Sequence, residues 1–222
     1  MLDTDFVIGL DFDNTLVSYD DAMHQTALEF NFIEENATVQ NKQGIRDYIR
    51  KLPEGEIKWQ KLQAEVYGKR MSQARLMKGA EKFLKICKEH DIKTFIVSHK
   101  SKYAAQDKER INLQETALNW MRQNRFFDRT GFGLSEDHVY FEESRREKAF
   151  RIKKLGCTHF IDDLQEIFRE EPFPQETVPI LFSPSNSQHV IEGGKVFRSW
   201  KDICNYFFTK PESLLTSKNS LN

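Results

Sequence analysis

Cysteine is scarce in this chain of 222 residues, and neither sign of charge is in excess. The three cysteines, Cys87, Cys157 and Cys204, are far apart and odd in number, which excludes a disulfide framework and a paired-cysteine zinc site. They fit a reducing, cytoplasmic compartment. Because 33 Lys and Arg stand against 34 Asp and Glu, there is no field of one sign to attract nucleic acid or an anionic membrane.

Long hydrophobic runs are also absent. The apolar run at residues 6–10 is shorter than a signal-peptide core and has no basic leader, and no later run approaches membrane-spanning length. Hydrophobic residues still make up 39% of the chain and include 18 Phe, enough for one core with a smaller insertion. We therefore expect a cytoplasmic protein with neither nucleic acid nor membrane as a partner. The sequence does not indicate its oligomeric state.

Short apolar runs alternate with helical periodicity along the chain. Residues 6–10 form a continuous apolar run, typical of a strand buried on both faces of a parallel sheet. Further strands are predicted at 94–97, 139–141 and 159–161, with a weaker one at 178–182, where Pro179 favours a sheet edge. The alternation predicts an α/β fold with a Rossmann-like parallel sheet flanked by helices.

The long stretch after the first strand has a helical pattern. Met23 and Ala27 share one helix face, as do Trp59 and Leu62. We predict a core domain of residues 1–17 and 79–209, a small all-helical cap domain of residues 18–78 inserted after the first strand, and a disordered tail at 210–222. The basic residues of the insertion are interpreted as its solvated face: Lys58, Lys61, Lys69, Arg70 and Arg75.

One helix start is well marked. Ser144 and Glu147 have capping-box spacing, and Gly156 supplies a stop, so Lys148 is predicted in the first turns of this helix. Lys153 and Lys154 lie one to two turns further on and are the alternatives to it. We expect His99, for which no orienting partner is evident, to bond to backbone.

Polar residues follow the predicted strands. In open parallel sheets, active sites lie outside the carboxyl ends of the strands, so these side chains should converge. They are Asp11, Asp13, Ser98, Lys148, Asp162 and Asp163. Carboxylates that meet repel one another unless a cation lies among them, and an all-oxygen ligand set favours Mg²⁺.

This pattern resembles the haloacid dehalogenase-like hydrolase superfamily. Its first motif, an apolar strand followed by D-x-D-x-T, stands here as VIGLDFDNT at residues 7–15. The second motif, a strand ending in Ser or Thr, is similar to TFIVS at 94–98, and the third, a lysine near a helix start, to Lys148. The fourth, an acidic pair after a strand, is similar to Asp162 and Asp163.

The resemblance implies roles for these residues. Asp11 would be the nucleophile that becomes an aspartyl-phosphate, and Asp13 the general acid and base. The phosphate would be bound by Thr15, Ser98 and Lys148. The metal would be held by Asp11, Asp13, Asp162 and Asp163, with the choice of direct ligand between the last two left open.

The function implied is a Mg²⁺-dependent phosphomonoesterase with a helical type 1 cap, acting on a small phosphorylated metabolite. A phosphomutase or phosphotransferase of the same fold is an alternative, and so is a non-catalytic binding or regulatory module. Dehalogenation is disfavoured because a halide leaves without a proton, so an acid such as Asp13 has no task there. No residue at 18–78 indicates which substrate is bound.

Overall fold

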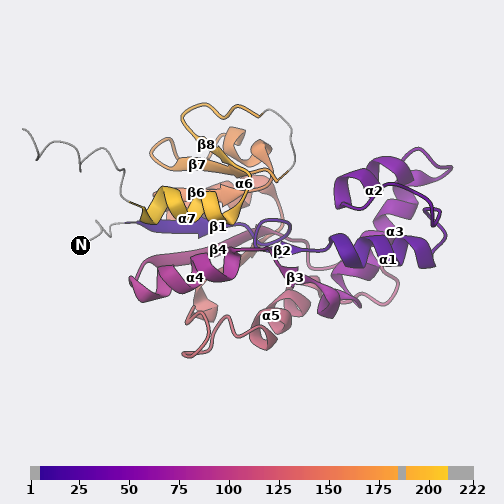
Figure 1. Ribbon diagram of the computed structural model, residues 1–222, viewed down its shortest axis with the longest axis horizontal. Coiled ribbons are helices and arrows are strands. Elements are labelled where there is room, and N and C mark those ends of the chain that lie inside the picture. Colours follow the sequence, from indigo (N-terminus) through magenta and orange to yellow (C-terminus); the bar gives the residue numbers. More distant parts are fainter. Residues whose placement is uncertain (1–5, 185–188, 210–222) are drawn as a thin grey trace, which may run out of the picture.

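The computed structural model describes residues 6–184 and 189–209. In Figure 1 a sheet flanked by helices forms one end of the molecule, and a lobe of helices α1–α3 forms the other. The predicted tail at 210–222 lies outside the described residues.

The main sheet has six strands in the order β5-β4-β1-β6-β7-β8, and every pairing in it is parallel. The strands are β1 (Val7–Leu10), β4 (Lys93–His99), β5 (Val139–Glu142), β6 (His159–Asp162), β7 (Val178–Phe182) and β8 (Lys195–Phe197). The sheet grows first to one side of β1 and then to the other, so its topological switch point lies at β1. The predicted Rossmann-like parallel sheet is confirmed.

The prediction of an edge strand at 178–182 is wrong. β7 pairs with β6 on one side and with β8 on the other, and β8 forms the edge. Pairing between β7 and β8 begins only at Ile180, one residue after Pro179. The missing N–H of Pro179 therefore interrupts no ladder with β8.

Alternate strand residues face two separate clusters of the core. Ile96 and Ile161 belong to the larger cluster, with residues of α4 (Ala80–Glu89), α5 (Leu113–Gln123) and α7 (Trp200–Phe208). Phe95 and Phe160 face the smaller cluster, with residues of α6 (Arg145–Lys154) and the 3₁₀ turn η3 (Gln165–Arg169). This alternation gives three layers, helix on sheet on helix. Another 3₁₀ turn, η2 (Glu136–His138), precedes β5.

The central strand β1 needs its glycine. A Cβ at Gly9 would lie 2.4 Å from Cδ2 of Phe160, its register partner on β6. Because real side chains do not approach so closely, only glycine at this position lets the ring of Phe160 pack against the backbone of β1.

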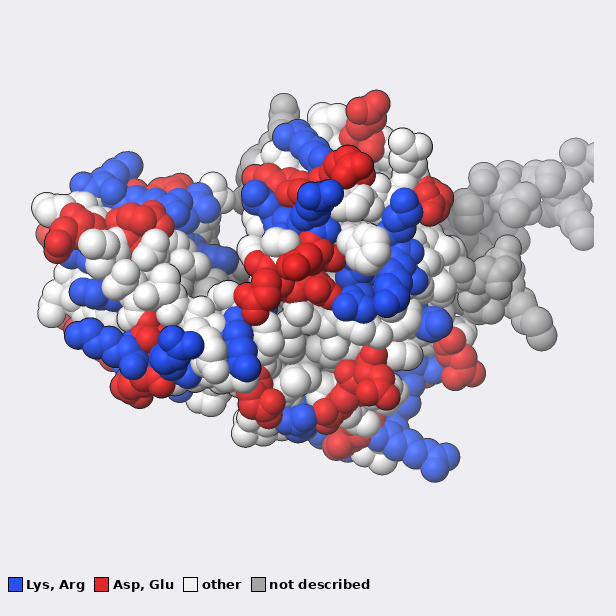
Figure 2. Space-filling model, turned by 180° about the vertical axis from the view of Figure 1, so that it is seen from behind, with Lys and Arg blue, Asp and Glu red and all other residues white. Residues whose placement is uncertain are grey.

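The helical lobe, called the cap below, is joined to the core by β2 (Val17–Ser18) and β3 (Arg75–Leu76), which pair antiparallel. It contains α1 (Asp20–Glu29), α2 (Lys42–Ile49), α3 (Gly55–Tyr67) and the 3₁₀ turn η1 (Met71–Gln73). In Figure 2 an indentation separates the cap from the core, and acidic and basic side chains alternate over that face. Among the described helices, none has the length and apolar character that crossing a membrane requires.

Candidate active site

The loop after β1 is held rigidly by backbone hydrogen bonds. The N–H of Asp11 donates to the carbonyl of Ile161 at 2.9 Å, and the N–H groups of Leu16 and Val17 both donate to the carbonyl of Phe12 at 3.1 Å. Asn14 takes a left-handed φ of 65°, a conformation that asparagine tolerates better than most residues. The carboxylates of Asp11 and Asp13 both line one pocket as a result.

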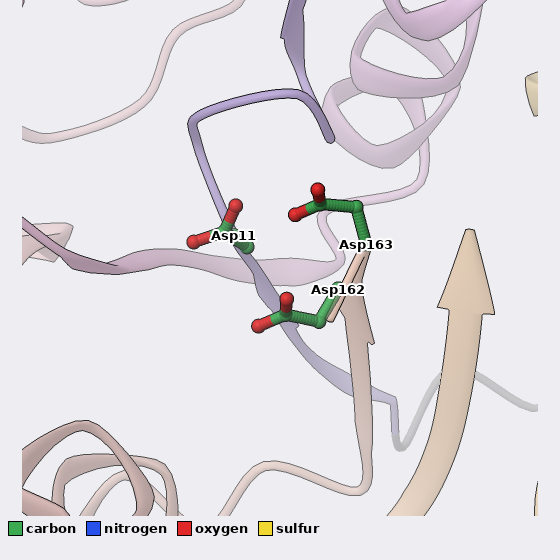
Figure 3. A group of neighbouring side chains, drawn as sticks. All are labelled: Asp11, Asp162 and Asp163. Atoms are coloured by element: carbon green, nitrogen blue, oxygen red, sulfur yellow. The ribbon is translucent and has the colours of Figure 1, made fainter. Parts of the chain in front are cut away.

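Three carboxylates meet at the ends of β1 and β6. Oxygen atoms of Asp11, Asp162 and Asp163 lie within 4.8 Å of one another, and Figure 3 shows the three side chains grouped around one point. Burial and the neighbouring carboxylates outweigh the opposing effect of Lys148, so the pKa of Asp162 is raised to about 7 and that of Asp163 well above its usual range. A divalent cation bound by these oxygens would relieve this repulsion, so the donor set suits Mg²⁺.

Lys148 neutralises part of the same cluster. Its Nζ donates to Oδ1 of Asp11 and to Oδ2 of Asp162, both at 2.6 Å, and its side chain is 4% exposed. Burial alone would lower the pKa of Lys148, but the two carboxylates outweigh it and raise the pKa. The predicted capping box is confirmed, since Oγ of Ser144 accepts from the N–H of Glu147 and donates to its carboxylate. This capping box fixes the start of α6, the helix from which Lys148 reaches Asp11 and Asp162.

Ser98 completes the hydrogen bonding of Asp11. Its hydroxyl donates to Oδ1 of Asp11 at 3.1 Å from the last part of β4. The same oxygen accepts from Lys148, so Oδ1 is fixed by two donors while no described residue donates to Oδ2. The second oxygen is the one available to a substrate or a metal.

Asp162 and Asp163 differ in what they contact. Both oxygens of Asp162 are engaged, one by Lys148 and the other by the N–H of Leu164 at 2.9 Å. Among the described residues, Asp163 accepts only a long contact of 3.5 Å from the hydroxyl of Thr15. Asp163 therefore has the more available oxygens for a metal, and Asp162 serves to hold Lys148.

The carboxylate of Asp13 has a separate set of partners, which sequence reasoning missed. Nζ of Lys100 donates to both of its oxygens, at 3.0 and 2.7 Å, and the hydroxyl of Tyr19 donates to Oδ1 at 2.5 Å. Burial raises the pKa of Asp13, but Lys100 and Tyr19 outweigh it, and the net pKa is lowered. In this arrangement Asp13 rests as a carboxylate. Lys100 is the second residue after Ser98, and that closeness was the available signal for it.

The pocket of about 380 Å³ over these residues lies between the core and the cap. Its cap side is lined by Lys42 at the start of α2 and by Gln60, Gln63 and Tyr67 of α3. Nothing in the local sequence singled these four out, because helical periodicity does not tell which polar face lies opposite another domain.

His99 of β4 makes the backbone contact expected for it, and two basic residues of the cap form ion pairs with acidic neighbours. Nε2 of His99 lies 3.1 Å from the carbonyl of Glu143, so the predicted backbone contact is confirmed. Lys69 pairs with Glu109 of the loop after β4, and Arg70 with Glu65 and Glu29.

Comparisons with known proteins find the fold but no close sequence relative. No protein-family model and no curated protein matches the chain. YfnB of Bacillus subtilis, a haloacid dehalogenase-like (HAD) hydrolase bound to magnesium, is 12% identical with a TM-score of 0.54, over 91% of this chain and 98% of YfnB. This chain has the HAD hydrolase fold.

Two other solved structures match this fold over most of the chain. A HAD family hydrolase of Deinococcus radiodurans, with bound phosphate and sodium, is 13% identical with a TM-score of 0.53, over 92% of this chain and 96% of that one. A protein described as a dehalogenase is 11% identical with a TM-score of 0.52, over 93% of this chain and 98% of that one. At such identities the likeness extends to the fold alone.

The polar residues predicted to converge at the strand ends do lie together in this structure. The pocket is lined by Asp11, Asp13, Ser98, Lys148, Asp162 and Asp163. Thr15 does not line it: its side chain is fully buried, and its hydroxyl donates to Asp163. The catalytic and metal-binding roles of these residues stay predictions.

Proposed function

We propose that the protein is a Mg²⁺-dependent phosphomonoesterase that acts on a small phosphorylated metabolite through an aspartyl-phosphate on Asp11. The observation that carries this proposal is the fixed Asp11 carboxylate, with Lys148 and Ser98 on one oxygen and Asp13 in the same pocket. The HAD-like structures bound to magnesium, and to phosphate with sodium, support it.

In the first step, Oδ2 of Asp11 forms a bond to phosphorus while the bond from phosphorus to the leaving oxygen breaks. Asp13 gives a proton to that oxygen, so the alcohol leaves uncharged. Asp13 rests ionised beside Lys100, and the negative charge of an arriving phosphate would raise its pKa toward the protonated form that this step needs.

In the second step, Asp13 takes a proton from water, and the water oxygen attacks phosphorus. The bond between phosphorus and Asp11 breaks, which releases inorganic phosphate and restores the carboxylate. Lys100 and Tyr19 stabilise the ionised Asp13 that acts as this base. Ser98 and Lys148 would donate to phosphate oxygens from the positions they take beside Asp11.

Mg²⁺ would supply positive charge next to the transferred phosphoryl group. We propose that Asp11 and Asp163 hold it directly with the backbone carbonyl of Asp13, because both oxygens of Asp162 are already bonded. Thr15 would then position Asp163 by its hydrogen bond rather than contact phosphate.

Phosphate is favoured over a halogenated substrate by Asp13. A displaced halide needs no proton, so a dehalogenase would have no task for an acid and base at this position. Here Lys100 and Tyr19 hold the Asp13 carboxylate in the pocket, where it can give and take a proton. We also propose a cytoplasmic location, consistent with three buried cysteines that form no disulfide.

The test is phosphate release from p-nitrophenyl phosphate and a metabolite phosphate panel, with Mg²⁺ and with a chelator, in the wild type and Asp11→Asn. Release that requires Mg²⁺ and falls at least about 10³-fold in the variant is expected. Transfer to an added alcohol without phosphate release would favour the phosphotransferase alternative. Halide release from haloacids, or no turnover of any compound, would overturn the proposal.

A further inference from the structure

Lys42 is the cation of the pocket that has no carboxylate partner. Three lysines line the pocket, and two of them are neutralised within it, Lys100 by Asp13 and Lys148 by Asp11 and Asp162. In the described parts of the chain no carboxylate oxygen lies within 4.0 Å of Nζ of Lys42, whose hydrogen-bond partner is Tyr67. Burial opposes the charge of Lys42, and its hydrogen-bond partner, the phenol of Tyr67, is neutral, so the ammonium can still take an anionic ligand.

The position of Lys42 is well defined by its surroundings. Its backbone N–H donates to Oδ1 of Asp20 at 2.8 Å, and the side chain of Asn41 caps α2 by accepting from Gly44. Nζ of Lys42 lies 5.7 Å from the centre of the Tyr67 ring, and Nζ of Lys100 lies 5.0 Å from the same ring. Tyr67 thus links the cap lysine to the lysine that holds Asp13.

The cap side of the pocket differs in charge from its core side, which is called the floor below and includes Asp11, Asp13, Asp162 and Asp163. All four acidic residues of the lining are Asp11, Asp13, Asp162 and Asp163 of the core, and none comes from the cap. The cap contributes the ammonium of Lys42, the phenol of Tyr67 and the amides of Gln60 and Gln63. Gln60 also accepts a contact from Gln106, so Gln63 is the freer amide.

We propose that Lys42, with Gln63 and Tyr67 beside it, binds a carboxylate on the leaving group, which makes the substrate an O-phosphorylated hydroxy acid. This inference rests on the proposed function, because the phosphate must first lie at Asp11. One unpaired cation with neutral donors around it matches a single negative charge better than a second phosphate. A pocket of about 380 Å³ limits the leaving group to a small molecule.

The pKa of Lys42 agrees with this charge state. Burial opposes its charge, but Tyr67, Asp163 and Asp13 outweigh burial and raise the pKa. The ammonium is therefore charged under any condition in which a carboxylate would bind.

The experiment compares kcat/KM for O-phosphorylated hydroxy acids of two to four carbons with the alcohol phosphates of the same length. The wild type is expected to prefer the acids, and Lys42→Gln to reduce that preference, the ratio of the two kcat/KM values, about 10- to 100-fold. Lys61→Gln is the matched control, because Lys61 is exposed on α3 and does not line the pocket.

The outcomes separate this inference from the proposed function. Equal turnover of acids and alcohols, a preference for bisphosphates, or an unchanged preference in Lys42→Gln would overturn the carboxylate site while phosphatase activity stands. No phosphate release from any compound would overturn both.

Discussion

The floor and the cap side of the pocket are built by opposite means. On the floor, two lysines form short hydrogen bonds with three of the four carboxylates: Lys100 with Asp13, and Lys148 with Asp11 and Asp162. On the cap side, a single lysine and neutral donors face the cavity without a carboxylate. The difference teaches that the floor is held by ion pairs within the protein, whereas the cap side presents a cation that no ion pair neutralises, as the proposed carboxylate site requires.

The largest effect should come from removing the floor lysine. Lys148→Met leaves Asp11 and Asp162 without their shared cation, and we expect the free energy of unfolding to fall by about 3–5 kcal/mol. Urea unfolding at neutral pH measures it. Lys153→Met, on the exposed side of the same helix, is the control.

Lys42 of the cap provides the comparison for the Lys148→Met variant. Because Lys42 has no carboxylate partner, Lys42→Met should change the free energy of unfolding far less than Lys148→Met. Equal losses in the two variants would break the comparison between floor and cap.

The second effect distinguishes the roles of Asp162 and Asp163. Asp163→Asn should weaken Mg²⁺ binding about 100-fold or more, since Asp163 keeps its oxygens available, and Asp162→Asn about 10-fold. Asp162→Asn should instead lower the free energy of unfolding, because Lys148 loses a partner. Isothermal titration with Mg²⁺ and urea unfolding measure the two effects, and a reversed ranking of Mg²⁺ affinities would assign the direct ligand to Asp162.

The third effect, which grows only as the pH falls, concerns the pH dependence of the fold rather than that of the site. Burial lowers the pKa of His159 on β6 from 6.5 to about 4, so between these values the unfolded chain binds a proton that the folded chain refuses. The free energy of unfolding should fall as pH drops through this range, by at most about 1.4 kcal/mol per pH unit, and His159 should contribute nothing above pH 6.5.

His159→Phe removes this titration and keeps a ring beside Phe6 and Phe207. The measurement is urea unfolding of both proteins from pH 4 to 7. Parallel curves would mean that other groups, such as the floor carboxylates, carry the pH dependence.

The strand-end residues were predictable because local pattern and global topology agree. An apolar run ending at Asp11 and another ending at Asp162 predict strands, and parallel strands bring their carboxyl ends together. The capping box likewise placed Lys148 correctly. The edge strand was wrong because Pro179 carries no information about which neighbour a strand acquires later in the chain.

The sequence by itself predicted the α/β fold and the set of carboxylates that come together at the carboxyl ends of its strands. Only the tertiary structure decided that Lys100 and Tyr19 hold Asp13, that Asp162 rather than Asp163 is tied to Lys148, and that Lys42 faces the pocket. The physical reason is that periodicity and caps act within a few residues, whereas an ion pair such as Lys100 with Asp13 joins side chains 87 positions apart.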